Sequence, residues 1–352
     1  MLTEKTILVT GGTGSLGKVL ARRLLTGELG VPRKIIVFSR DEAKQHAMRV
    51  EYMNKANATD EVIYQNFKEL LEFRIGDVRD FHSVAEALRG VDVVFNAAAL
   101  KQVPTCEYFP FQAVLTNIEG PENIIRAIQE LNLPVETVVG ISTDKACKPV
   151  NVMGMTKSLQ ERIFIQANMR CPQTRFICVR YGNVLASRGS VIPLFHDQIR
   201  NGGPVTITTP EMTRFLLSLD QAVDTIFIAY RGAKRGETYI PRVPSARVID
   251  IASILIGERP IKTVVTGIRP GEKVHEILIS EEECHRSVDR GEYYAILPML
   301  PELSNGEQYT PALQDEFSST DNVMDLAGLA EMLRHYHLML DDNLQEDGEL
   351  LR

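Results

Sequence analysis

The sequence predicts an α/β fold, a doubly wound parallel sheet followed by a smaller C-terminal lobe. Short runs rich in Val and Ile alternate with helical patterns through the first half of the chain. The runs show little alternation of polar and apolar residues, as is typical of strands buried on both faces. A glycine-rich turn follows the first run, and after residue 183 Gly and Pro interrupt the chain more often. The expected strands are 6–10, 34–38, 73–78, 91–97, 137–143 and 175–182.

Helices are expected between these strands and in the second half of the chain. Leu16, Leu20 and Leu24 repeat at helical spacing after the glycine-rich turn. Asp80 is the expected N-cap of the helix FHSVAEALR, and Gly90 its C-terminal stop. Further helices are expected at 218–231, 248–257 and 327–340, and the final residues, 341–352, are expected to fray.

The composition excludes several classes of protein. The chain of 352 residues is long enough for a large core and two lobes. Its formal net charge of -7 argues against nucleic-acid binding. We find no signal peptide and no apolar run long enough for membrane insertion. The five cysteines are scattered without a CxxC pair, which predicts reduced thiols, no metal site and a cytoplasmic location.

The turn after the first strand predicts a dinucleotide site. Gly12, Gly14 and Gly17 form a GxGxxG pattern that follows a strand and opens a helix. Such a turn lets the backbone approach a pyrophosphate, which the helix N-terminus then stabilises. The second strand ends in Ser39 and Arg40 before Asp41. A hydroxyl and a guanidinium suit a 2′-phosphate, so we predict NADP over NAD; in the alternative, Asp41 binds the ribose.

We predict cofactor contacts from the strand ends that follow the glycine turn. Asp77 and Val78 would flank an adenine, and the small residues 97–99 would let the cofactor lie close. The whole predicted cofactor set is Gly11, Thr13, Gly14, Ser15, Leu16, Gly17, Ser39, Arg40, Asp77, Val78, Ala97, Ala98, Ala99, Lys101, Lys157, Tyr181 and Asn183.

The fifth strand is followed by the candidate catalytic residues. Thr143, Asp144 and Lys145 emerge at a carboxyl end near the switch point of the sheet, where open α/β sheets bind ligands. A hydroxyl, a carboxylate and an ammonium can supply hydrogen bonds, an acid and a base. The alternative is a capped turn with a surface ion pair. The preceding glycine turn and the following Lys157 favour the chemical interpretation.

Together these motifs resemble the extended short-chain dehydrogenase/reductase superfamily, which has a Rossmann fold. Within it the chain is similar to the short, soluble nucleotide-sugar 4,6-dehydratases of polysaccharide and flagellin-sugar biosynthesis. The motifs are TGGTGSLG (10–17), FSRDE (38–42), GDVRD (76–80), AAALKQVP (97–104), STDKA (142–146), NVMGMTK (151–157), RYGNVLASRGSVIP (180–193), MTRF (212–215) and RPGEKVHE (269–276). The resemblance implies NADP, a UDP-sugar substrate and a homo-oligomer. The implied organisation is an NADP-binding domain (1–182) on which helix 218–231 packs, a substrate lobe (183–300) and a tail with one helix (301–352).

The resemblance also implies a mechanism. Hydride leaves C4 of the sugar for the cofactor, the C5 proton is removed, the C6 hydroxyl leaves as water, and hydride returns to C6. By resemblance Lys145 is the C5 base, which requires a lowered pKa, and Asp144 is the acid at the C6 oxygen. Lys157 would bind the nicotinamide ribose. The inverting members of the family convert UDP-N-acetylglucosamine into a 5-epimerised 4-keto-6-deoxy sugar.

Position 153 departs from the superfamily pattern, because Met153 replaces the usual tyrosine. A thioether cannot transfer a proton, so the base for the C4 hydroxyl must be another group. We favour the Asp144–Lys145 pair, with Thr143 only as a relay.

The substrate prediction includes basic and polar residues of the second half. The predicted set is Lys101, Met153, Asn183, Val184, Ser187, Arg188, Arg214, Arg269, Glu272 and His275. Three alternatives remain open: a retaining 4,6-dehydratase, a nucleotide-sugar 4-epimerase, and an inactive NADP-binding scaffold.

Overall fold

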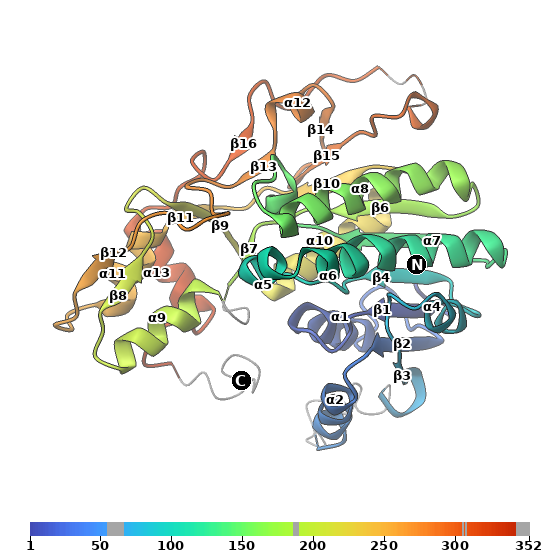
Figure 1. The fold of residues 1–352 in the computed structure, drawn as a ribbon, viewed down its shortest axis with the longest axis horizontal. Helices are drawn as coiled ribbons and strands as arrows, with labels where there is room; N and C mark the ends of the chain where they lie inside the picture. Colours follow the sequence, from blue (N-terminus) through green and yellow to red (C-terminus); the bar gives the residue numbers. More distant parts are fainter. Residues whose placement is uncertain (55–66, 186–189, 305, 307, 343–352) are drawn as a thin grey trace.

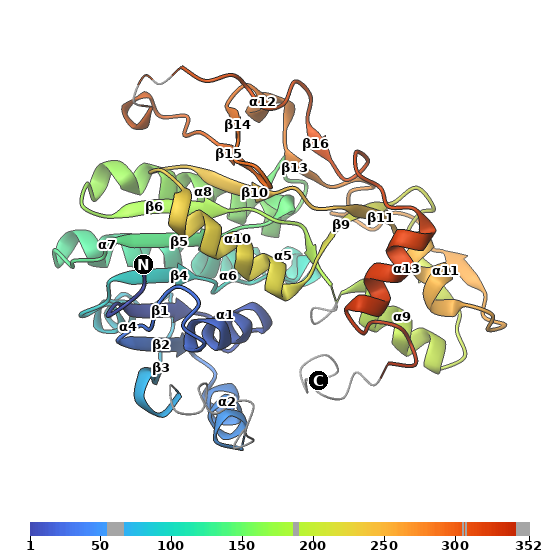
Figure 2. The same cartoon turned by 180° about the vertical axis from the view of Figure 1, so that it is seen from behind.

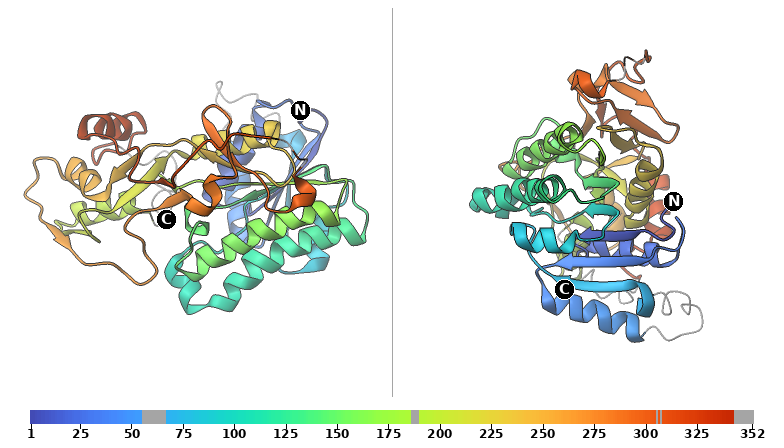
Figure 3. Two further views of the ribbon diagram at one scale, coloured as in Figure 1. Left: turned by 90° about the horizontal axis from the view of Figure 1, so that it is seen from above. Right: turned by 90° about the vertical axis from the view of Figure 1, so that its right-hand side faces the viewer.

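A computed structural model of the chain describes residues 1–54, 67–185, 190–304, 306 and 308–342. Ser187, Arg188 and the last ten residues of the tail expected to fray therefore lie outside the described residues. Two lobes lie side by side along the longest axis of the molecule (Figures 1 and 3).

The larger lobe is built on a nine-stranded sheet, which confirms the predicted fold class. Its order is β14-β15-β10-β6-β5-β4-β1-β2-β3. The strands from β3 to β10 run parallel, whereas β15 and β14 add an antiparallel edge. The order reverses between β1 and β4, which is the switch point expected for a ligand. The bounds are β1 Thr6–Thr10, β2 Lys34–Ser39, β3 Leu71–Ile75, β4 Val93–Asn96, β5 Thr137–Ile141, β6 Arg175–Val179, β10 Thr238–Pro241, β14 Ser287–Asp289 and β15 Tyr293–Ile296.

Helices cover both faces of this sheet, as the apolar strands require. Successive residues of a strand point to opposite faces, so Ile7 and Val9 join one core while Leu8 joins the other. Helices α1 and α10 pack on the first face, and α4, α7 and α8 on the second (Figures 1 and 2). The bounds are α1 Ser15–Leu25, α2 Glu42–Asn54, α4 Phe81–Ala87, α5 Val103–Tyr108, α6 Pro110–Val114, α7 Gly120–Glu130, α8 Val152–Arg170 and α10 Leu219–Gly232.

The smaller lobe has its own apolar core and short strands. Phe195, Leu216, Ile251 and Leu329 are among the side chains buried in it. Strands β7, β9 and β11 form one sheet, and β8 pairs with β12. The bounds are β7 Asn183–Val184, β8 Val205–Ile207, β9 Thr213–Leu217, β11 Ser245–Arg247, β12 Thr263–Val265, α9 Val191–Arg200, α11 Val248–Ile256 and α13 Leu326–His335.

A third segment connects the lobes above the edge of the large sheet (Figure 1). Strand β13 pairs with β16 in an antiparallel ribbon. The bounds are β13 Ile277–Ile279, α12 Glu281–Cys284 and β16 Phe317–Ser318.

Several boundaries differ from the sequence expectation. The large sheet continues past residue 182, because β10, β14 and β15 come from the range expected for the substrate lobe. The expected strand 137–143 ends at Ile141, since Thr143 caps the turn that follows. Asp80 is the N-cap as predicted, accepting from the amides of His82 and Ser83. That helix ends at Ala87, three residues before the predicted stop at Gly90. Gly90 has a left-handed φ of 71°.

Candidate active site

The STDKA turn (residues 142–146) places its side chains at the carboxyl end of β5. The amide of Asp144 donates to the Tyr181 carbonyl at 3.0 Å, which anchors the turn to the chain after β6. Thr143 caps the short 3₁₀ turn that contains Asp144 and Lys145, because its hydroxyl accepts from the Lys145 amide. The local sequence thus turns the carboxylate and the ammonium toward the same side of the sheet edge.

Four side chains form a compact acid–base cluster around Lys145. Lys145 Nζ donates to Asp144 Oδ1 at 3.0 Å and to Asn183 Oδ1 at 3.1 Å. It also lies 3.2 Å from Glu276 Oε1. Thr143 donates its hydroxyl proton to Asp144 Oδ1 at 2.8 Å. The cluster brings together three predicted catalytic residues and Asn183, and it adds Glu276.

Each of the two carboxylates of this cluster has one buried oxygen that is not hydrogen-bonded among the described residues. Asp144 is 0% exposed and Glu276 is 2% exposed. Asp144 Oδ2 and Glu276 Oε2 have no hydrogen-bond partner among the described residues. A buried carboxylate oxygen without a partner is costly, so these atoms are the natural contacts of a polar ligand. The sequence analysis does not predict Glu276 as a site residue, although it ends the RPGEKVHE motif. Glu276 is 131 residues from Lys145 in the sequence, and only the fold places the two side by side.

The charge state of Lys145 differs from the expectation. Burial lowers the pKa of its ammonium, but Asp144 and Glu276 outweigh that effect and raise the pKa above its usual value. The expected lowering of this pKa is therefore wrong for this arrangement. Lys145 is a cation held by two carboxylates, and it needs a proton acceptor before it can act as a base.

Helix α8 carries Lys157 and Met153 behind the turn. Asn151 caps this helix by accepting from the Gly154 amide at 2.7 Å. Lys157 Nζ donates to the Ile141 carbonyl at 2.5 Å and to Gln160 Oε1 at 2.7 Å. Burial lowers the pKa of Lys157 to about 8. This ammonium thus lies at the end of β5, one residue before the STDKA turn.

Met153 lies in an apolar cluster. The side chain is 5% exposed and packs with Cys106 and Ala113, with Leu100 and Val103 at the margin. The residue supplies an apolar wall and no proton, as the sequence predicted for a thioether.

The glycine turn has the close contacts that a dinucleotide site requires. Gly11 has a φ of 65°, and a Cβ there would lie 2.8 Å from the Ala98 backbone. A Cβ on Gly17 would lie 2.5 Å from Gly12 Cα, so only glycine lets α1 start so close to the turn. Helix α1 begins directly after Gly14, and its first amides face the turn. The residues present fit a pyrophosphate at this helix N-terminus.

The end of β2 carries the residues on which the prediction of NADP over NAD rests. Both carboxylate oxygens of Asp41 already have partners in the first turn of α2. Oδ1 accepts from the Lys44 amide at 3.0 Å, and Oδ2 pairs with Lys44 Nζ at 2.9 Å. Ser39 accepts from Thr13 at 3.2 Å. The Arg40 side chain is 56% exposed and lies 3.8 Å from Asp77 Oδ2. Asp41 therefore works as the cap of α2, whereas Ser39 and Arg40 contact other side chains at the same strand end.

Other predicted cofactor residues line the same edge of the sheet. Ala98 donates its amide to Thr10 Oγ1 at 3.2 Å, next to Gly11. Asp77 is held by Arg79, and Val78 accepts from Asn123 at 3.0 Å. The remaining members occupy the glycine turn, the β4 end and the β6 end: Ser15, Leu16, Ala97, Ala99, Lys101 and Tyr181.

The predicted substrate residues do not all lie at the acid–base cluster. Val184 lies with Asn183 in β7, beside the acid–base cluster. Arg214 is buried and donates to the carbonyls of residues 213, 273 and 274, so it fastens the RPGEKVHE segment. Glu272 accepts from Thr208, and its other oxygen lies 3.9 Å from the exposed Arg269. The remaining member is His275, which is hydrogen-bonded to Thr213 at 2.8 Å.

A buried ion network behind the turn was missed from the sequence. Arg180 is 3% exposed and pairs with both Glu161 and Glu283, at 2.6 and 2.8 Å. Ser142 donates to Glu161 as well. No spacing rule could have found this set, because its members lie just after β5, on α8, just after β6 and on α12. The network fixes the base of the STDKA turn.

Comparisons with known proteins identify the family of the chain. A family model described as "Polysaccharide biosynthesis protein" matches residues 7–298. The chain belongs to this family. It is 41% identical over 344 residues to a protein named UDP-glucose 4-epimerase from Rickettsia conorii, with 95% of this chain and 96% of the relative covered. The same identity and coverage hold for the protein of that name from Rickettsia prowazekii.

Solved structures with a similar fold confirm the predicted fold class. Pen from Bacillus thuringiensis matches with a TM-score of 0.85 and 33% identity, over 96% of this chain and 99% of that one. The dTDP-glucose 4,6-dehydratase DesIV from Streptomyces venezuelae, solved with NAD, has a TM-score of 0.64 at 21% identity, over 76% of this chain and 86% of that one. The family inferred from the motifs is thus confirmed, while the particular dehydratase reaction stays a prediction.

Two further findings concern the described part of the chain. There, no helix is both long and apolar enough to cross a membrane. Within the same residues, no group of three or more His, Cys, Asp or Glu side chains is arranged to hold a metal ion.

Proposed function

We propose that the protein is an NADP-dependent 4,6-dehydratase that converts UDP-N-acetylglucosamine, with inversion at C5, into a 4-keto-6-deoxy nucleotide sugar for surface polysaccharide or glycan synthesis. The acid–base cluster of Asp144, Lys145 and Glu276 at the switch point carries this proposal. Elimination of water needs a base at C5 and an acid at the C6 oxygen. The adjacent Asp144 and Lys145 offer one of each.

The raised pKa of Lys145 is compatible with this chemistry if the proton moves within the cluster. Transfer of one proton from Lys145 to Asp144, across 3.0 Å, leaves a neutral amine beside a neutral carboxylic acid. The amine is then the C5 base and the acid can protonate the departing C6 oxygen. Closure of the site over a sugar removes water and penalises the charged pair, which favours the neutral one. The proton that the C4 hydroxyl loses on oxidation would pass through Lys145 to Glu276, 3.2 Å away, which leaves the amine free for the C5 proton. Glu276 would return a proton when C5 is protonated again.

The cofactor would bind at the glycine turn and extend to Lys157. A bound nicotinamide dinucleotide supplies the hydride acceptor for C4 and the donor for C6. Residues 11–17 would hold its pyrophosphate, and Ser39 with Arg40 its 2′-phosphate. Lys157 would orient the nicotinamide ribose from its position against the Ile141 carbonyl.

The substrate would lie between the cluster and the smaller lobe. Asn183 and Val184 would contact the sugar, and the exposed Arg269 would contact the diphosphate, since a guanidinium fork binds two oxygens at once. Arg214 would hold the segment that carries Arg269. The proposed contacts are Lys101, Met153, Asn183, Val184, Ser187, Arg188, Arg214, Arg269, Glu272 and His275.

A second candidate is a UDP-sugar 4-epimerase, which the names of the 41% identical relatives favour. Epimerisation at C4 moves one proton at the C4 hydroxyl and needs no acid at C6. The cluster has two buried carboxylates and one lysine, which is more acid–base groups than the transfer of one proton requires. We therefore favour dehydration.

The deciding experiment is incubation with UDP-N-acetylglucosamine and analysis of the product. We expect a mass loss of one water, no net NADPH, and an inverted C5 by NMR. An unchanged mass with an inverted C4 supports the epimerase, a retained C5 the retaining dehydratase, and absence of turnover with cofactor bound the inactive scaffold. Lys145→Ala should abolish exchange of the C5 proton with solvent, and the exposed Lys262→Ala should not.

Cofactor preference and assembly complete the proposal. We expect NADP to bind more tightly than NAD and Arg40→Leu to remove that difference, which equilibrium titration measures. We also propose a cytoplasmic homo-oligomer, because α5, α6 and α8 expose large apolar side chains together. They are Tyr108, Phe109, Phe111, Met155 and Leu159. Light scattering of the purified chain tests the oligomer.

A further inference from the structure

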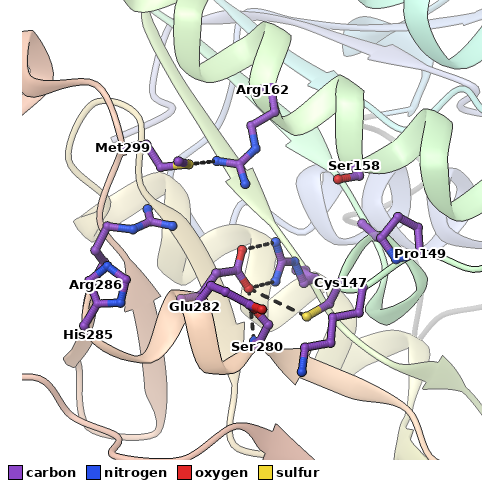
Figure 4. Close-up of a pocket in the computed structure, with 13 residues that line it drawn as sticks. Cys147, Pro149, Ser158, Arg162, Ser280, Glu282, His285, Arg286 and Met299 are labelled. Atoms are coloured by element: carbon purple, nitrogen blue, oxygen red, sulfur yellow. Dashed lines mark hydrogen bonds and ion pairs between the residues drawn. The ribbon is translucent and has the colours of Figure 1, made fainter.

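A second cavity lies behind the STDKA turn, outside the proposed active site. Its volume is about 460 Å³, within the range of small-molecule sites. Its walls come from the segment 146–149, from α8, from α12 with the residues after it, and from Met299. Figure 4 shows Arg162 and Arg286 approaching this cavity from two different walls.

Arg162 and Arg286 have no carboxylate partner. Among the described residues, Arg162 donates only to the sulfur of Met299, and Arg286 only to the carbonyl of Leu297 at 2.6 Å. A guanidinium has five N–H donors, so most of the donors of both side chains are free. The Ser158 hydroxyl, on the same wall as Arg162, also has no partner in the described structure.

The acidic groups at the cavity are already engaged. Glu283 accepts two hydrogen bonds from the buried Arg180, at 2.8 and 3.0 Å. The Ser280 hydroxyl lowers the pKa of the Glu282 carboxyl by hydrogen bonding. Lys148 is paired with Glu316 at 2.8 Å. Among the described residues at the cavity, the two guanidinium groups and the Glu282 carboxylate are therefore the charges without an ion-pair partner, and the exposed side chain of His285 lies beside them.

We propose that this cavity binds a small phosphorylated metabolite, with its phosphoryl group between Arg162 and Arg286. Two guanidinium forks match the oxygens of a phosphoryl group and bind it bidentately. Burial lowers the pKa of Arg286, Glu283 raises it in part, and Arg162 lowers it further, so an anion there would also relieve the repulsion between the two cations. Ser158 supplies a further hydrogen bond, and the volume leaves space for the body of the ligand.

The position of the cavity makes the ligand a regulator of the active site. The wall formed by residues 146–149 continues the turn that carries Asp144 and Lys145, and the Cys147 amide donates to the Asp144 carbonyl at 3.1 Å. Lys148 has a φ of 43°, a left-handed conformation that costs free energy for a residue other than glycine. A ligand against this wall would press on a turn that already holds a strained residue, and would thereby shift the placement of the acid–base pair.

Calorimetric titration with inorganic phosphate and with pyrophosphate, at constant ionic strength, tests the binding site. We expect saturable binding to the wild type and at least a tenfold rise in Kd in Arg162→Gln and in Arg286→Gln. Arg231→Gln, at an exposed arginine of α10, is the matched control and should bind as the wild type does. Because Arg162 is exposed on α8, its substitution leaves the fold intact, which a thermal melt verifies.

The outcomes separate this cavity from the proposed nucleotide-sugar site. Equal affinity in all variants places the phosphate elsewhere and overturns the proposal, as does equal binding of acetate and phosphate. The titration needs no turnover, so it succeeds or fails independently of the proposed reaction. Saturating phosphate should also change kcat of the wild type and not of Arg162→Gln; binding without such a change overturns the regulatory role.

Discussion

Gly154 is the point where helix α8 touches the STDKA turn, and Gly154→Ala tests how tightly the turn must be held. A Cβ on Gly154 would lie 2.2 Å from the Lys145 carbonyl oxygen, whereas Cβ contacts under 3.0 Å essentially do not occur. The helix or the turn must therefore move by about 0.8 Å. Overpacking of this kind costs about 1–3 kcal/mol of unfolding free energy. A displacement of nearly 1 Å at a reacting group lowers turnover by about 100-fold.

The assay is kcat for loss of water from UDP-N-acetylglucosamine, together with urea unfolding of each variant. Gly232→Ala on α10 is the control, because the nearest atom to its Cβ is the Tyr239 hydroxyl at 3.3 Å. We expect the control to keep the wild-type values within about 0.5 kcal/mol. Full turnover and unchanged stability in Gly154→Ala would refute the reasoning that the helix positions Lys145.

The buried charges give two further predictions. The lowered pKa of Lys157, about 8 against 10.5 in the unfolded chain, means that the folded state binds fewer protons between these pH values. The free energy of unfolding should therefore rise by about 3 kcal/mol from pH 8 to pH 10.5 relative to Lys157→Met, and a constant difference in urea unfolding would contradict this. Arg180→Met leaves Glu161 and Glu283 buried without their cation, and should lower the unfolding free energy at pH 7 by about 3–5 kcal/mol. Protonation should restore part of this loss as the pH falls, and denaturation that is insensitive to pH would argue against it.

The parallel strands and the glycine turn could be predicted from the sequence, because each depends on local composition. Val93 and Val94 both point into apolar cores, so a continuous apolar run is itself the signal of a doubly covered strand. The antiparallel edge at 287–296 could not be predicted in this way. Its two strands are only 3 and 4 residues long, and pairing with β10 is a tertiary event.

The acid–base turn could be predicted only in part. Its own residues are consecutive, so their position after β5 was clear from the strand pattern. Their charge states depend on Glu276, which the fold brings within 3.2 Å of Lys145 from a distant segment. The proton affinity of an ammonium depends on whether one or two carboxylates lie beside it. No local sequence pattern distinguishes these two cases.

Met153 has a consequence for how the activity varies with pH. With an apolar side chain at this position, no phenol near pH 10 contributes to the titration of the site. Asp144 and Glu276 both lie within 3.2 Å of the Lys145 ammonium, so the proton affinity of Lys145 depends on both carboxylates. The inflections of a pH–rate profile are then macroscopic constants of the whole cluster. Substitution of any single member shifts all of them together.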